Sequence, residues 1–141
     1  VRAATFSASR SKTVRSLPVC TKRVPMAPPI APALMASGLD GQSFAFRGYL
    51  PAKTDERRAA IHRCEKDSSA LHQSQIFIET PYRHDSLLGD LLEQLSPATR
   101  LCIAADITLP DAFIRTDTVA SWRKNKPIIG KRPCVFIILA R

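Results

Sequence analysis

The chain has 141 residues, of which 45% are hydrophobic and 23% charged, the size and composition of about one globular domain. No apolar run approaches the ~20 residues needed to span a bilayer, so we expect a soluble protein with no membrane partner. The net charge of +9 suggests a polyanionic partner such as RNA. Six of the basic residues, however, lie in the first 39 positions, which contain no acid, so residues 40–141 carry only +3.

Residues 1–32 differ in character from the remainder. They are rich in Ser, Arg and Pro and show no apolar periodicity, so they cannot bury enough surface to offset the entropy of ordering. We therefore expect a disordered basic tail over residues 1–32 and one folded domain over residues 33–141. An organellar transit peptide, an ordinary tail and sequence foreign to the parent fold all fit this composition. Five of the eleven prolines fall between Pro18 and Pro32, which predicts no helix before Ala33.

From Ala33 onward, helical and strand patterns alternate. Gly38 should end a first helical turn, and Thr54 should cap the first long helix. The predicted order is helix 33–38, strand 43–50, helix 54–71, strand 75–79, helix 85–95, strand 101–106, short strand 112–115, short helix 118–124 and strand 135–140. The side chains expected to share one face are Phe44 and Phe46 on the first strand, Ala60, Ile61, Cys64 and Leu71 on the first long helix, and Leu87, Leu88, Leu91, Leu92 and Leu95 on the next.

This alternation predicts an α/β fold with a mixed sheet flanked by helices. The last strand is apolar throughout, so it is expected at the centre of the sheet, covered on both faces. Ligands of such sheets bind beyond the carboxyl ends of strands, near helix N-termini. The segments 79–83 and 106–108 each follow a predicted strand, and we expect them at such a ligand-binding edge.

The side chains of these two segments allow two interpretations each. Glu79 could act as a general base or ligand acceptor and Arg83 could bind an anion, but an ion pair between them that only fixes the turn is favoured on spacing alone. Asp106 and Asp111 could be site carboxylates with Arg115 as their partner. The favoured interpretation is that all three are solvated charges on a rim of the surface.

Two further groups of residues have weaker signals. A basic cluster before the last strand could contact phosphates, although a solvated loop is favoured; it comprises Lys124, Lys126, Lys131 and Arg132. The four cysteines are scattered, and the residues His62, Cys64 and His72 complete no tetrahedral set, so we expect no metal. Reduced thiols in a cytoplasmic protein are the interpretation of this cysteine usage.

Three segments in this order resemble a known family. They are SGLDGQSFAFRGYLP (residues 37–51), IETPYR (78–83) and AADITLP (104–110). Over residues 33–140 the chain resembles the C-terminal domain of the tetrapyrrole methylase superfamily, in the branch of ribosomal small-subunit cytidine 2′-O-methyltransferases. No one segment is specific, but the ordered set is.

The resemblance implies transfer of a methyl group from S-adenosylmethionine, with RNA as the acceptor favoured by the branch. The cofactor of this family lies between two α/β domains, and members are commonly homodimers. Carried over by position, the residues at the cofactor wall would be Glu79, Thr80, Pro81, Asp106 and Thr108, with Arg83 toward the substrate. The resemblance assigns no catalytic residue.

The chain also departs from the family. The N-terminal domain, with its glycine-rich segment and aspartate-containing loop, has no counterpart in residues 1–32. We therefore expect a truncated, frameshifted or selected fragment that alone is inactive and binds the cofactor weakly or not at all. A non-catalytic basic RNA-binding module is the alternative of another class, and a degenerate fragment without function is a third.

Overall fold

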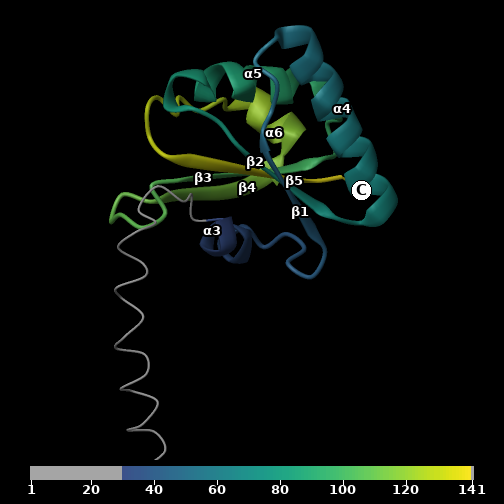
Figure 1. The fold of residues 1–141 in the computed structure, drawn as a ribbon. Coiled ribbons are helices and arrows are strands. Elements are labelled where there is room, and N and C mark those ends of the chain that lie inside the picture. The colour runs from purple at the N-terminus through teal and green to yellow at the C-terminus, as the bar shows by residue number, and fades with distance from the viewer. Residues whose placement is uncertain (1–29, 141) are drawn as a thin grey trace, which may run out of the picture.

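A computed structural model describes residues 30–140 (Figure 1). The predicted basic tail lies outside the described residues except for its last three positions. Along the chain the elements are α3 (Ile30–Ser37), β1 (Phe44–Tyr49), α4 (Thr54–Leu71), β2 (Ser74–Ile78), the 3₁₀ turn η1 (Pro81–Arg83), α5 (His84–Gln94), β3 (Arg100–Ala105), β4 (Phe113–Thr118), α6 (Val119–Lys124) and β5 (Cys134–Leu139).

The five strands form one mixed sheet in the order β1-β2-β5-β3-β4. β1 and β2 are parallel, whereas β5 is antiparallel to both of its neighbours and β4 is antiparallel to β3. The last strand is therefore central, as predicted from its apolar sequence. Because β2 and β3 are both antiparallel to β5, the strands β1, β2 and β3 all run in the same direction.

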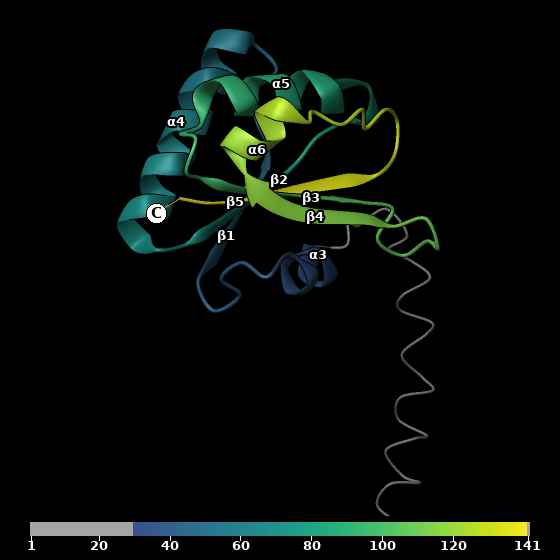
Figure 2. The same ribbon diagram turned by 180° about the vertical axis from the view of Figure 1, so that it is seen from behind.

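Helices cover the two faces of the sheet unequally. Figure 1 and Figure 2 show α4, α5 and α6 on one face and α3 on the other. Because successive side chains along a strand point to opposite faces of the sheet, the strands contribute to two hydrophobic cores, one on each face. The sheet residues of the three-helix core include Phe77, Leu101, Ile103, Phe136 and Ile138, and those beneath α3 include Ile76, Cys102, Ala104, Val135 and Ile137.

The helix α3 begins earlier than expected. It starts at Ile30, not at Ala33, because Pro32 falls in the first turn, where a backbone N–H has no acceptor within the helix and a proline is tolerated. The helix ends at Ser37 as predicted, and Gly38 follows with a φ of 70°.

The helix α4 has the predicted bounds, but two of its details were wrong. Thr54 is the first helical residue, and the cap position is taken by Lys53, whose side chain makes no capping hydrogen bond. Leu71, expected inside, is 60% exposed. The helix extends past the sheet: Ser68, one turn earlier, already accepts a hydrogen bond from the backbone N–H of Ala140 at the end of β5 (2.9 Å).

Both edge strands carry more polar or exposed residues than a buried strand. Phe44 and Phe46 in β1 share one face as predicted, but each is about half exposed. β4 is six residues long, longer than the predicted 112–115, because it pairs with the whole of β3 from Arg100 opposite Thr118 to Ala105 opposite Phe113. Its sequence FIRTDT lacks the apolar run by which a buried strand is recognised.

Candidate functional site

The strand directions bring the two predicted segments to one edge of the sheet. β2 ends at Ile78 opposite Val135, and β3 ends at Ala105 opposite Cys134, the first residue of β5. Glu79 and Asp106 therefore flank the start of β5, as expected for residues that follow parallel strands separated by one antiparallel strand. We refer to this part of the molecule as the strand-end edge.

Glu79 is buried at this edge with one carboxylate oxygen unused. The residue is 7% exposed, and its Oε1 accepts a hydrogen bond from the backbone N–H of Thr80 (2.8 Å). Among the described residues, Oε2 has no hydrogen-bond partner. No ion pair between Glu79 and Arg83 is formed in the described structure, residues 30–140. The interpretation that these two side chains pair to fix the turn is therefore wrong.

His84 is buried directly behind Glu79. Its Nε2 lies 2.9 Å from the backbone carbonyl oxygen of Glu79, and because a carbonyl only accepts, Nε2 donates. Its Nδ1 has no hydrogen-bond partner in the described part of the chain. The ring packs edge-on against Phe136 of β5, with 6.0 Å between centroids. His84 was not among the predicted site residues, because its burial depends on the sheet against which it packs.

The other residues predicted after β2 lie on the surface. Thr80 precedes η1 in an extended conformation, and its carbonyl accepts from the backbone N–H of Arg83 (2.9 Å). Thr80, Pro81 and Arg83 are all exposed. The proline at the first position of η1 fixes the turn that carries Arg83 outward from the edge.

Asp106 has a backbone conformation that is uncommon for a residue with a side chain. Its φ is 52°, and its N–H donates to the carbonyl of Pro133 (3.0 Å), which continues the pairing of β3 with the segment before β5. Its carboxylate is about 10% exposed and lies 3.4 Å from Nε of Arg132. Thr108 is exposed in the following turn. Asp106 is thus a mostly buried carboxylate paired with Arg132, whereas Asp111 is exposed.

Arg115 belongs to another part of the surface. It pairs with Asp117 (2.8 Å) and lies 4.9 Å from the ring centroid of Trp122. Hydrogen bonds from Ser121, Arg115 and the Thr118 N–H lower the pKa of the Asp117 carboxyl. Arg115 therefore supports the end of β4, in agreement with the rim interpretation.

The basic loop before β5 is held against the strand-end edge, which sequence reasoning did not predict. The Asp85 carboxylate accepts backbone hydrogen bonds from Ile129 (2.9 Å) and Gly130 (3.2 Å). Lys131 Nζ lies 5.0 Å from the ring centroid of Tyr82, and Arg132 pairs with Asp106. Contacts between residues so far apart in the chain leave no local signal in a sequence.

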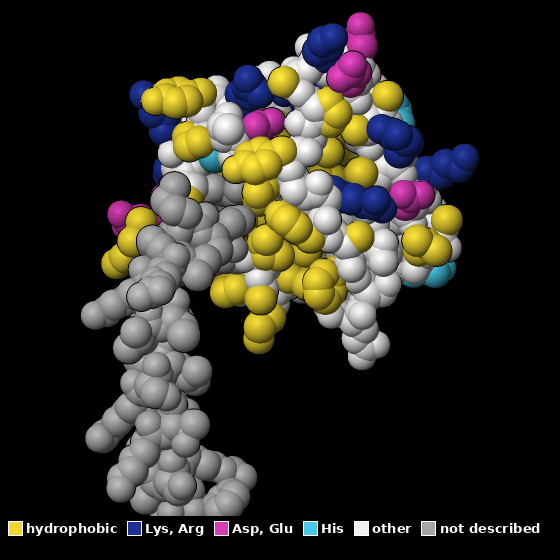
Figure 3. Space-filling view, in the orientation of Figure 1, with side chains coloured by type: hydrophobic (Ala, Val, Ile, Leu, Met, Phe, Trp, Pro, Cys, Tyr) yellow, Lys and Arg dark blue, Asp and Glu magenta, His cyan; other side chains and the backbone are white. Residues whose placement is uncertain are grey.

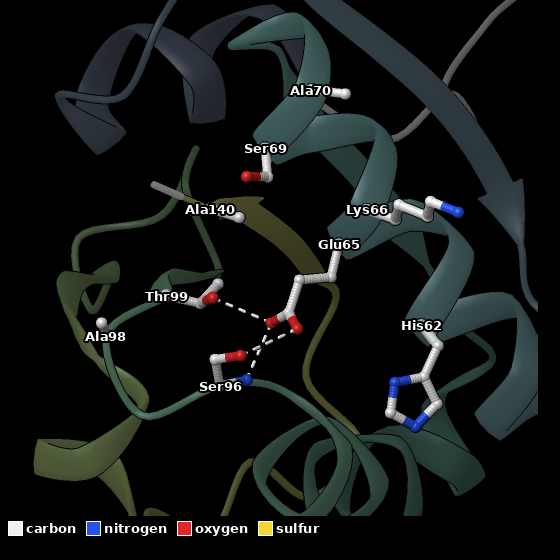
Figure 4. A pocket seen from close by; sticks show the side chains of 9 residues that line it. All are labelled: His62, Glu65, Lys66, Ser69, Ala70, Ser96, Ala98, Thr99 and Ala140. Carbon is white, nitrogen blue, oxygen red and sulfur yellow. Dashed lines mark hydrogen bonds between the residues drawn. The ribbon is translucent and has the colours of Figure 1, made fainter.

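A polar hollow of about 400 Å³ lies at the opposite end of the sheet (Figure 4). There the Glu65 carboxylate accepts from the backbone N–H of Ser96 (2.8 Å), the Ser96 hydroxyl (3.1 Å) and the Thr99 hydroxyl (2.8 Å). With its oxygens occupied, Glu65 fixes the turn between α5 and β3. The hollow contains none of the predicted site residues.

Metal and membrane features were searched over residues 30–140. No group of three or more His, Cys, Asp or Glu side chains in this range could hold a metal ion. No helix in this range is long and apolar enough to cross a membrane. Cys64, Cys102 and Cys134 are buried free thiols.

Comparisons with known proteins place this geometry in a family. The chain is 34% identical over 98 residues to Ribosomal RNA small subunit methyltransferase I of Mesorhizobium japonicum, covering 68% of this chain and 32% of that protein. The protein of the same name from Vibrio cholerae is 37% identical over 89 residues, or 62% of this chain and 30% of that protein. No family model matches the chain.

Two solved structures share the fold. The methyltransferase CobJ has a TM-score of 0.52 at 17% identity, covering 79% of this chain and 47% of that one. Diphthine synthase has a TM-score of 0.54 at 12% identity, covering 77% and 44%. The chain belongs to the tetrapyrrole methylase superfamily. This tetrapyrrole methylase chain spans about a third of the length of the curated relatives it matches.

Proposed function

We propose that this chain forms one wall of the cofactor cleft of an S-adenosylmethionine-dependent methyltransferase whose methyl acceptor is RNA. The names of the curated relatives support the acceptor class. The observation that carries the proposal is the strand-end edge itself, where Glu79 is buried with one carboxylate oxygen that has no partner within residues 30–140, and where the paired Asp106 follows the next parallel strand.

The residues at this edge fit the proposed cofactor. S-adenosylmethionine carries a positive sulfonium, which a carboxylate attracts electrostatically, and an ammonium group and ribose hydroxyls, which can donate hydrogen bonds to it. A buried carboxylate oxygen without a partner costs free energy unless a ligand donates to it. The bound cofactor would supply the methyl group, and the residues that would line its wall are Glu79, Thr80, Pro81, Asp106 and Thr108, with Arg83 toward the acceptor.

The proposed assembly extends beyond the described residues. Because the chain spans about a third of its curated relatives, the second wall would come from a further domain or from a second copy of the chain. The chain alone should then bind the cofactor weakly and should not transfer methyl groups. We also propose a cytoplasmic location, supported by the three buried free thiols.

The test is thermal unfolding of the purified chain across a titration of S-adenosylmethionine. A ligand at its dissociation constant adds about 0.4 kcal/mol, which moves the midpoint of a unit of roughly 100 residues by about 2–3 °C. We expect such a shift at millimolar ligand, its loss in Glu79→Gln, and its retention in Glu65→Gln at the opposite hollow. An equal shift in Glu79→Gln and the wild type, or an equal loss of the shift in Glu65→Gln, would contradict the proposed site.

A further inference from the structure

Tyr82 is an aromatic side chain held out from the strand-end edge. It is 82% exposed and sits in the middle of η1, between Pro81 and Arg83. An isolated exposed tyrosine needs no explanation. This one is not isolated, because the ammonium of Lys131 lies 5.0 Å from its ring centroid.

The position of Lys131 is fixed from both sides along the chain. On one side Asp85 binds the N–H groups of Ile129 and Gly130, and on the other Arg132 pairs with Asp106. Gly130 turns the chain with a φ of 68°, a conformation that few other residues adopt. The lysine beside the tyrosine is thus presented by an anchored loop.

Two acidic groups that hold the anchored loop, Asp85 and Asp106, are already engaged, and Glu79 is buried. The Asp85 carboxylate is occupied by two backbone donors, and Asp106 is paired with Arg132. Within residues 30–140, the cations Arg83, Lys126 and Lys131 form no ion pair. Figure 3 shows Lys and Arg side chains gathered at the upper left, over the start of α5 and the loop into β5. Uncompensated cations around an exposed ring are typical of surfaces that bind single-stranded nucleic acid.

We propose that Tyr82 is a stacking platform for a base of single-stranded RNA and that Arg83, Lys126 and Lys131 contact the flanking phosphates. An unpaired strand fits this surface better than a duplex, since an aromatic ring can stack only on a base that is exposed. Asp85 is a positioning residue that holds the loop. This assignment rests on the proposed RNA acceptor and adds residues that contact it.

The experiment measures fluorescence anisotropy of a labelled single-stranded cytidine 12-mer titrated with the full chain, without cofactor, at about 50 and about 200 mM salt. Tyr82→Ala should weaken binding about 5-fold or more, whereas Tyr82→Phe should bind within about 2-fold of the wild type because its ring still stacks. Lys131→Ala should weaken binding. It should also reduce the slope of log binding constant against log salt concentration by about 1, the value for one lost phosphate contact. Lys66→Ala, at the opposite hollow, is the matched control and should bind as the wild type does.

Asp85→Asn tests the loop separately. Losing the charged acceptor should weaken RNA binding with Tyr82 and Lys131 still present, while circular dichroism shows a folded chain. Equal binding by Tyr82→Ala and the wild type would overturn the proposal, as would equal losses in Lys66→Ala and Lys131→Ala. Tight binding of a duplex of the same length would also overturn it. Because no cofactor is present, a failure of the proposed cofactor site leaves this measurement unchanged.

Discussion

Two buried polar atoms that have no partner among residues 30–140 mark the segment that follows β2. Oε2 of Glu79 and Nδ1 of His84 lie within the same six residues, and an unsatisfied buried group costs about 1–3 kcal/mol. The turn is therefore not arranged for stability alone. Such local costs are typical of sites whose missing hydrogen bonds are completed by a ligand.

The Cys134 thiol makes the stability of the fold sensitive to alkaline pH. Burial raises its pKa from 9.0 to about 12. The pKa of this thiol is therefore higher in the folded chain than in the unfolded chain. Its contribution to stability is fully present below pH 9.0 and is lost as the pH rises toward 12, because over this range the unfolded chain releases the thiol proton and the folded chain retains it. We expect the free energy of unfolding, measured with urea, to fall more steeply above pH 9 in the wild type than in Cys134→Ala.

The comparison between those two proteins isolates the thiol from the lysines and tyrosines that titrate in the same range. The alanine variant should be less stable at neutral pH, since the substitution removes buried volume next to β3. Parallel curves for the two proteins above pH 9 would rule out the assigned role.

At the residue scale, the sequence placed the two strand-end segments at one edge of the sheet but did not predict their contacts. Glu79 and Asp106 could be placed at one edge because each follows a strand, and strand direction then decides the edge. The role of Asp85 could not be read, because its acceptor function depends on Ile129 and Gly130, 44 and 45 residues away. The ion pair favoured for Glu79 was wrong because the 3₁₀ turn carries Arg83 outward.

The helices α4 and α5 are joined by a buried ion pair. Arg57 pairs with Asp90, and the two side chains are only 5% and 10% exposed. Removing one partner leaves the other charge buried without a counter-ion. We expect Asp90→Ala to lower the free energy of unfolding by about 3–5 kcal/mol, measured by urea denaturation.

A neighbouring pair on the same two helices provides the control. Glu93 pairs with Arg58 (2.9 Å) and is 62% exposed, so Glu93→Ala should cost less than about 1 kcal/mol. If Asp90→Ala and Glu93→Ala lowered the free energy of unfolding by similar amounts, burial of the Arg57–Asp90 pair would not be what stabilises the packing of α4 against α5.

At the element scale, apolar periodicity was sufficient where an element is buried and insufficient where it is not. The leucine stripe of α5 and the apolar run of β5 gave both elements correctly, because burial imposes a period on the sequence. β4 was predicted too short because an edge strand keeps polar residues, and Leu71 was misplaced because periodicity does not show where the sheet beneath a helix ends.

The whole molecule has one face with many exposed apolar side chains. Figure 3 shows them gathered over α3 and β1, and they include Met35, Phe44, Phe46 and Tyr49. An apolar hollow of about 430 Å³ lies between α3 and the start of β1. Because β1 is also an edge strand, this face combines two features that promote association.

We expect the isolated chain to self-associate through this face. Phe46→Lys should reduce the concentration-dependent rise of the sedimentation coefficient by placing a charge on the edge strand. Leu71→Lys is the matched control, since Leu71 is similarly exposed at the end of α4, and it should behave as the wild type does. The same decrease in both variants would point to net charge and not to the β1 face.

The central position of β5 also has a consequence for the order of events during synthesis. β2 and β3 have no hydrogen bonds to each other, and each is completed only by β5 between them. Until Cys134–Leu139 leaves the ribosomal exit tunnel, β2 and β3 each lack a neighbour on one side, so any pairing of β1 with β2 or of β3 with β4 leaves an open strand edge. We expect slow release of this strand to prolong the exposure of those edges and the need for chaperones.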